Sequence, residues 1–130
     1  MPAVFVYGTL RSGQQNHWLM RELAATRVGD ALTVAPMSLW LDRETGIPYL
    51  TVEPRWRIVG ELYSVPGGAL PQLDAFEEHP DVYRREPLRV VQEARERRAY
   101  AYVYPGSVVG MQLIDGGDFV LAVARATGAR

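Results

Sequence analysis

Apolar and polar positions at the start of the chain predict a strand, a loop and a helix. Val4-Phe5-Val6-Tyr7 is a run of good strand formers. Gly8 and Gly13 then bound a polar loop, and a glycine at a strand end lets the backbone turn sharply or approach a ligand closely because no Cβ intervenes. A helical pattern follows over residues 16–25. We place Asn16 at its N-cap, and its inward residues are Trp18, Leu19 and Leu23.

The middle of the chain alternates between strand patterns and a second helix. Extended patterns cover residues 27–37, 38–42, 47–52 and 55–65. The last is the most regular, and it places Glu61 on the same side as Val59, Tyr63 and Val65. The second helix is predicted over residues 69–78, and on a 100° wheel its apolar face is formed by Leu70, Leu73 and Phe76.

The last third of the chain predicts two strands and a short helix. The strands cover residues 83–92 and 99–104 and are separated by a charged turn over 93–98. The helix covers residues 119–127 and is capped by Asp118. Many strands at short spacing with embedded helices indicate an α+β domain with a mixed or partly closed sheet. Because we find no repeat or linker, we expect one domain over residues 1–130.

The composition argues against nucleic-acid binding, membrane binding and cysteine chemistry. The 130 residues are 48% hydrophobic, and 14 basic against 15 acidic residues give a net charge of −1. No basic field therefore exists to hold nucleic acid or an anionic membrane. The absence of cysteine excludes disulfides, thiolate nucleophiles and cysteine-ligated metals. The start shows no leader pattern and no apolar run approaches the ~20 residues of a membrane span, so we expect a cytoplasmic protein.

One acidic residue occupies an unusual place in the second helix. On the wheel Glu77 falls between Leu70 and Leu73, inside the apolar face, whereas Glu78 points away and reads as a surface charge. A carboxylate among core residues is costly unless it is paired. Desolvation would also raise its pKa toward the range that suits general acid–base chemistry. The structural alternative is an ion pair with a nearby arginine, Arg84 or Arg85, while Asp74 could face either way.

Other catalytic constellations find no support in the sequence. His79 lies near a helix C-terminus, where a histidine commonly serves only the helix dipole. His17 starts a helix and has no acidic partner at metal-ligand spacing, so a zinc site is not expected. No serine lies in a nucleophile-elbow pattern. The Gly8–Gly13 loop could bind an anion through its amides, but no lysine completes a phosphate-binding P-loop.

Several short motifs follow one another between residue 4 and about residue 104, in the order in which a known family has them. The chain thereby resembles the gamma-glutamylcyclotransferase-like family, in particular its gamma-glutamylamine cyclotransferase branch. The motifs are Val4-Phe5-Val6-Tyr7-Gly8-Thr9-Leu10, Gly13-Gln14, Asn16-His17, Ile47-Pro48, Gly60-Glu61-Leu62-Tyr63, Leu73-Asp74 with Phe76-Glu77, Pro80, Tyr83 with Arg85, and Tyr102-Val103-Tyr104. The segment after Gly106 matches less clearly.

The resemblance implies a small mixed β-barrel flanked by short helices, with the residue 7–10 loop and Glu77 facing one cavity. It implies a reaction without metal or cofactor on a small γ-glutamyl substrate. In that reaction the α-amine of the γ-glutamyl group attacks its own γ-carbonyl, gives 5-oxoproline and releases an amine.

The same resemblance assigns roles to site residues. Glu77 becomes the general acid and base. The amides of Gly8, Thr9 and Leu10 bind the α-carboxylate or the developing oxyanion. Tyr7 and Tyr83 line the pocket. Tyr102 and Tyr104 share a strand face, and we expect one of them, taken as Tyr102, to reach the cavity.

Two other functions remain open on the sequence. The first is a non-catalytic module that binds a small ligand in the same cavity, although an unused buried acid would cost stability. The second is a hydrolase in which Glu77 activates water. The sequence does not identify the released amine, the oligomeric state, or whether Glu78 and His79 contact the leaving group.

Overall fold

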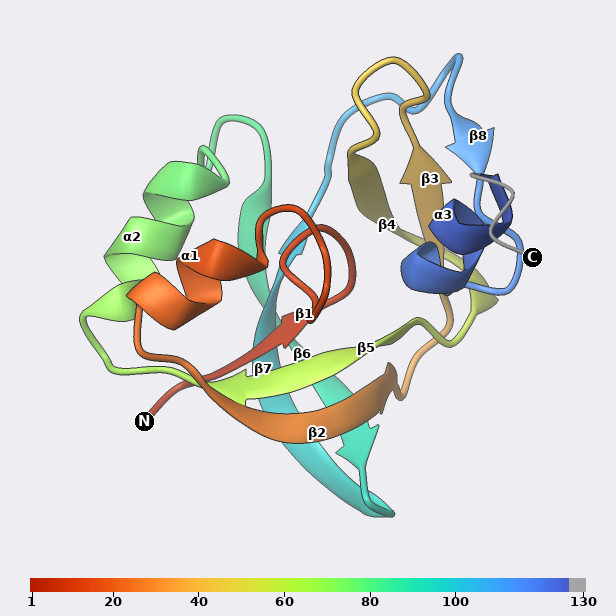
Figure 1. Cartoon of the computed structure of the whole chain (residues 1–130). Helices are drawn as coiled ribbons and strands as arrows, with labels where there is room; N and C mark the ends of the chain where they lie inside the picture. The colour runs from red at the N-terminus through yellow and green to blue at the C-terminus, as the bar shows by residue number, and fades with distance from the viewer. Residues whose placement is uncertain (127–130) are drawn as a thin grey trace.

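The computed structural model describes residues 1–126, and five of its strands close into a barrel (Figure 1). In barrel order these are β1 (Ala3–Val6), β5 (Val59–Ser64), β2 (Thr26–Thr33), β6 (Arg84–Gln92) and β7 (Arg95–Val103). Neighbouring strands are antiparallel except β1 and β7, which close the barrel as a parallel pair at Val4 and Tyr100. The α+β class and the small mixed barrel are confirmed.

A second, three-stranded sheet stands at one end of the barrel. It contains β4 (Pro48–Trp56), β3 (Met37–Leu41) and β8 (Gln112–Leu113), and α3 (Phe119–Ala126) lies beside it. The other two helices, α1 (His17–Glu22) and α2 (Ala69–Phe76), lie together on the opposite side of the molecule (Figure 1). The sequence pattern did not separate this sheet from the barrel, and it missed β8.

Two neighbouring barrel strands, β1 and β5, are buried on both faces. Phe5 and Leu62 belong to a cluster drawn from all five strands, which fills the barrel interior. Their neighbours Val4 and Tyr63 belong to a second cluster, which packs the outside of the barrel against α1 and α2. Alternation along a strand sends successive side chains to opposite faces. Both faces of β1 therefore need apolar residues, which is why its sequence is a continuous apolar run.

The first helix differs from the prediction in its length and its buried face. It spans His17–Glu22 rather than residues 16–25. Trp18, expected inside, is 48% exposed, and Met20 is the residue of this helix that is buried. Asn16 occupies the N-cap position without a side-chain capping bond. Leu23 is buried and Leu19 is half-buried against the same core, as predicted. Trp18 is misplaced because a helix of this length makes fewer than two turns, so its face is set by one or two contacts.

Of the other two helices, the second ends earlier than predicted and the third begins where predicted. The second helix stops at Phe76 and Glu77 is its C-cap, because Glu78 adopts a left-handed backbone with φ 53°. The third helix begins where predicted, and the Asp118 cap is confirmed since the Leu121 amide donates to Asp118 Oδ1 at 3.2 Å. Residue 127, its predicted end, lies outside the described residues.

The turn between the last two barrel strands is much tighter than predicted. Strand β7 starts at Arg95, so the connection is Glu93-Ala94 rather than residues 93–98. Both turn residues have positive φ, 51° and 61°. Two-residue hairpin turns with such angles normally contain glycine or asparagine. The sequence therefore carried no turn signal at this position.

The described residues contain neither a membrane-spanning helix nor a cluster of metal ligands. Within residues 1–126 no helix has the length and apolarity that crossing a membrane requires. Among the same residues no three His, Asp or Glu side chains gather in a way that could hold a metal ion.

Candidate active site

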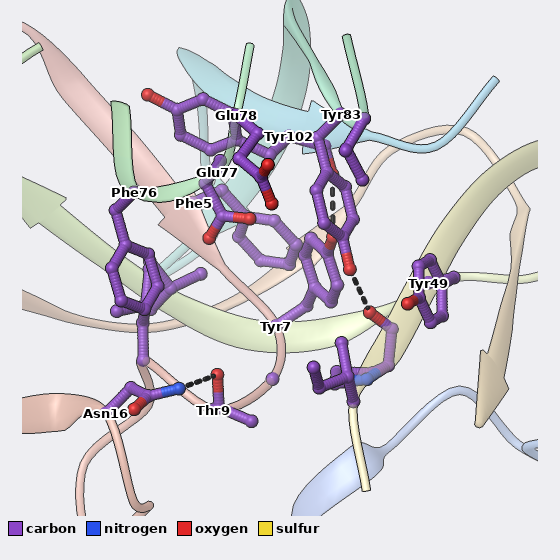
Figure 2. Close-up of a pocket in the computed structure, with 16 residues that line it drawn as sticks. Phe5, Tyr7, Thr9, Asn16, Tyr49, Phe76, Glu77, Glu78, Tyr83 and Tyr102 are labelled. Carbon is purple, nitrogen blue, oxygen red and sulfur yellow. Dashed lines mark hydrogen bonds between the residues drawn. The ribbon is translucent and has the colours of Figure 1, made fainter. Parts of the chain in front are cut away.

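A cavity of about 190 Å³ lies where the loop after β1, the end of α2 and the start of β4 meet (Figure 2). Its lining residues are Phe5, Val6, Tyr7, Gly8, Thr9, Leu10, Asn16, Ile47, Pro48, Tyr49, Phe76, Glu77, Glu78, Val82, Tyr83 and Tyr102. Pockets for drug-sized ligands measure roughly 300–1,000 Å³. This cavity therefore suits a small polar group rather than a large cofactor.

The loop after β1 has its shape fixed by close packing and by its own hydrogen bonds. A Cβ on Gly8 would lie 2.3 Å from Pro48 Cγ, so only glycine allows the loop to approach the start of β4. The Arg11 amide donates to the Gly8 carbonyl at 3.0 Å and closes a turn. Asn16 donates to Thr9 from both its main-chain amide, at 2.9 Å to the carbonyl, and its side chain, at 3.0 Å to Oγ1.

Three successive amides of this loop have no acceptor in the described structure. The main-chain N–H groups of Gly8, Thr9 and Leu10 donate to none of residues 1–126, although Gly8 and Leu10 are buried. Main-chain amides in folded proteins nearly always find an acceptor, so these three are left to donate to water or to a ligand in the cavity. Successive free N–H groups at a cavity wall bind an anion such as a carboxylate or an oxyanion.

Glu77 brings an unpaired carboxyl group to the same cavity. It follows the last residue of α2 and lies among the aromatic lining residues (Figure 2). Its carboxyl group makes no hydrogen bond or ion pair with any of residues 1–126, so the expected alternative of a pair with Arg84 or Arg85 is wrong. Burial raises the pKa of Glu77 from its ordinary value of 4.5 to about 7.

A polar network behind the cavity fixes the end of α2. Asp74, one turn before Glu77, accepts hydrogen bonds from Tyr102 Oη at 2.8 Å and from Arg85 Nη1 at 3.1 and 3.2 Å. His79 Nδ1 accepts the Arg85 amide at 2.9 Å, so this histidine orders the chain after the helix rather than serving a helix dipole. Two strands and the helix end are thereby held together at the position of Glu77.

Tyrosines form the wall of the cavity. Tyr7 donates its hydroxyl to the Tyr102 carbonyl at 2.6 Å, and Tyr83 donates to the Pro48 carbonyl at 2.8 Å (Figure 2). The Tyr49 ring stacks on that of Tyr83 with centroids 5.5 Å apart. Burial, followed by other tyrosines, Glu77 or Asp74, raises the pKa of Tyr7, Tyr83 and Tyr102. These hydroxyls therefore stay neutral and act as donors near the carboxyl group.

The charge on the cavity lining is entirely negative. The charged lining residues are Glu77 and Glu78, and no arginine or histidine is among the lining residues. Glu78, expected as a surface charge, is exposed and also borders the cavity. For an anion, this lining therefore offers neutral donors, which are backbone amides and hydroxyl and amide side chains, and no basic side chain.

The structure brings seven of the residues that the sequence nominated to one cavity. Tyr7, Gly8, Thr9, Leu10, Glu77, Tyr83 and Tyr102 all line the one cavity, whereas Tyr104 packs edge-on against Tyr49 and does not. Sequence reasoning missed Asn16 as a lining residue. It also missed the buried pair of Arg11 and Glu61, although Glu61 carried the same signal as Glu77, an acid among apolar neighbours of one face.

Comparison with known proteins gives consistent results. The model of the family described as "Gamma-glutamyl cyclotransferase, AIG2-like" matches residues 4–121. The gamma-glutamylaminecyclotransferase B of Danio rerio is 41% identical over 95 residues, which are 69% of this chain and 50% of that protein. The chain thus spans about half the length of that relative.

Two further similarities extend over nearly the whole chain. A Methanocaldococcus jannaschii protein, named provisionally as a gamma-glutamylcyclotransferase, is 34% identical over 121 residues, which are 92% of this chain and 96% of that one. The crystal structure of an AIG2-like protein of Mus musculus superimposes with a TM-score of 0.81 at 29% identity, covering 91% of this chain and 88% of the other.

Proposed function

The chain belongs to the gamma-glutamyl cyclotransferase, AIG2-like family, and we propose that it cyclises the γ-glutamyl group of a γ-glutamyl amine to 5-oxoproline and releases the amine. One observation carries the proposal. A carboxyl group without a partner and three amides without an acceptor border the same cavity of about 190 Å³. The reaction needs one proton carrier and one site for negative charge, and these two features supply them.

The loop amides provide the site for negative charge. As the α-amine attacks the γ-carbonyl carbon, the carbonyl oxygen becomes negative, and preorganised N–H groups stabilise it. The free amides of Gly8, Thr9 and Leu10 can hold this oxygen or the α-carboxylate of the substrate. Ring closure is intramolecular, so a cavity that keeps the glutamyl chain folded supplies much of the rate.

Glu77 provides the proton carrier. Its carboxylate accepts a proton from the α-ammonium, and the freed amine forms the new C–N bond. When the tetrahedral intermediate collapses, the old C–N bond breaks and Glu77 returns the proton to the departing nitrogen. The nitrogen of the new ring then gives up a second proton, which Glu77 also passes to the departing nitrogen. Of the three protons on the original ammonium, one stays on the lactam nitrogen and two leave on the released amine, which departs as its ammonium form. A pKa of about 7 suits both steps near neutral pH.

The charge of the cavity bears on the leaving group. With Glu77 and Glu78 as its charged lining residues, the cavity repels a leaving group that carries a carboxylate and tolerates a neutral or cationic one. We therefore propose amines rather than α-amino acids as the released group. Expected turnover is highest for γ-glutamyl conjugates of diamines, lower for those of alkylamines and lowest for γ-glutamyl amino acids.

The test is release of 5-oxoproline from these three substrate series by the wild type, Glu77→Gln and Glu78→Gln. Gln keeps the shape of Glu77 but cannot carry the proton. The turnover of Glu77→Gln should therefore fall by about 10²–10⁴-fold, which is what general acid–base catalysis contributes. Glu78→Gln is the matched control at the next residue: it should retain turnover of γ-glutamyl alkylamines and lose only part of the preference for diamine over amino-acid conjugates. Equal turnover in Glu77→Gln would contradict the assigned role.

The identity of the released product distinguishes cyclisation from the two alternatives, a hydrolase and a binding module. Free glutamate in place of 5-oxoproline would indicate hydrolysis. A folded wild type that binds γ-glutamyl compounds and releases neither product would be a binding module.

A further inference from the structure

A buried ionic cluster lies directly behind the loop that carries the three free amides. Arg11, the residue after Leu10, is only 7% exposed. Its Nη1 donates to Asp118 Oδ1 at 3.0 Å, and its Nε lies 3.4 Å from Glu61 Oε2. Neither carboxylate lines the cavity. Three distant parts of the chain, the loop, β5 and the start of α3, therefore meet at one guanidinium group.

Glu61 anchors the loop to the barrel. It is 4% exposed, and its Oε1 accepts both the Ser12 amide at 2.9 Å and the Tyr63 hydroxyl at 2.9 Å. Arg27 Nε lies 3.9 Å from the same oxygen. Glu61 is paired across the sheet with Val6, the last residue of β1. The loop thus leaves the barrel beside Glu61 and is tied back to it six residues later.

Asp118 connects the same loop to the third helix. Its Oδ1 accepts Arg11 Nη1 and also caps the helix by accepting the Leu121 amide at 3.2 Å. Phe119, the first residue of that helix, is 2% exposed in the barrel core. The helix is therefore anchored, and through Asp118 it limits where Arg11 can lie.

We propose that Arg11, Glu61 and Asp118 are positioning residues that hold the amides of the residue 8–10 loop in their anion-binding arrangement. Those amides have no hydrogen bond of their own to fix them, so their orientation depends on the bonds at each end of the loop. At one end the Asn16 contacts fix Thr9, and at the other the ionic cluster fixes Arg11 and Ser12. The reactive role of the amides rests on the proposed function, whereas their rigidity does not.

The experiment measures loop order and turnover on the same variants. Backbone ¹⁵N relaxation is recorded for the wild type, Glu61→Gln and Asp118→Asn. Asn is as good an N-cap as Asp, so Asp118→Asn keeps the α3 cap and removes only the charge facing Arg11. The matched control is Glu96→Gln, which removes the carboxylate of an exposed pair with Arg89 on the same barrel.

The order parameters of residues 8–10 should fall from about 0.85, typical of rigid backbone, toward 0.6 in both cluster variants and stay unchanged in the control. In Glu61→Gln, kcat/KM should fall on the order of 10²-fold, the size of effect that a misplaced site group produces. The loss should lie in kcat if the amides hold the oxyanion, and in KM if they hold the α-carboxylate.

The order parameters and the turnover together separate the positioning role from the proposed function. Unchanged order parameters in folded Glu61→Gln would overturn the inference, and if that variant does not fold, Asp118→Asn decides in the same way. A loosened loop in a protein whose wild type releases no 5-oxoproline would refute the proposed function and leave the positioning role standing. A loosened loop with unchanged kcat/KM would refute the link between loop order and catalysis.

Discussion

Replacing Glu77 by Gln should stabilise this protein at alkaline pH while it removes the activity. Burial raises the pKa of this carboxyl group from 4.5 to about 7, so the folded state binds its proton more tightly than the unfolded state does. Stability therefore decreases as the pH rises from about 4.5 to about 7, since the unfolded state releases the proton first. At 1.36 kcal/mol per pH unit, the charged form costs the folded protein roughly 3 kcal/mol above pH 7.

The assay is urea denaturation of the wild type and Glu77→Gln at pH 4.5 and at pH 8. The difference in unfolding free energy between the two proteins should move in favour of the Gln variant by roughly 3 kcal/mol between the two pH values. Other carboxyl groups titrate equally in both proteins and cancel. Glu78→Gln, which removes an exposed charge at the next residue, controls for the loss of one negative charge. A difference independent of pH would refute the claim that burial destabilises the Glu77 carboxylate.

Three further predictions test the site and the fold. In the wild type kcat/KM should rise with pH through about 7, because Glu77 must be ionised to accept the first proton, and a flat pH profile would move the base elsewhere. Gly8→Ala should abolish turnover, since its Cβ would lie 2.3 Å from Pro48 Cγ; Gly67→Ala, with open space around it, is the control in the same 5-oxoproline assay. Ala94→Gly should stabilise the protein by up to about 1 kcal/mol, because the φ of 61° costs an alanine about 1–2 kcal/mol and the greater freedom of unfolded glycine takes back roughly 0.5–1; an unchanged or lower melting temperature would count against it.

The sequence predicted the elements of the site better than their local geometry. The loop after β1 and Glu77 were recognisable because a glycine at a strand end and an acid on an apolar face both violate simple patterns. The wheel placed Glu77 on the buried face of the helix, and Glu77 does line the cavity, but α2 ends at Phe76, so Glu77 caps the helix instead of lying on its face. It also placed Phe76 inside, whereas Phe76 is 38% exposed at the cavity.

What the sequence could not give is pairing between distant residues. Nothing local distinguishes Asp74 from Glu77 as the partner of Arg85, because the choice depends on how β6 lies against α2. The role of Asp118 shows the same limit. Its cap was predicted from its own neighbours, but its contact with Arg11, 107 residues earlier, requires the closed barrel. Turn prediction failed at Glu93-Ala94 because the tertiary fold imposes positive φ on residues with no preference for it.

The parallel pair that closes the barrel has a consequence for how the protein is made. Strand β1 leaves the ribosome before the other strands, yet its parallel partner β7, which contains Tyr100, is synthesised much later. The hydroxyl of Tyr7 likewise bonds to a carbonyl 95 residues further along the chain. Folds dominated by such distant contacts form slowly, in milliseconds to seconds. The entropy lost in closing the long loop comes before the stabilising contacts form. The apolar first strand therefore stays unpaired on that side until β7 has emerged, and the cavity, which Tyr102 of β7 lines, is complete only when the last barrel strand is in place.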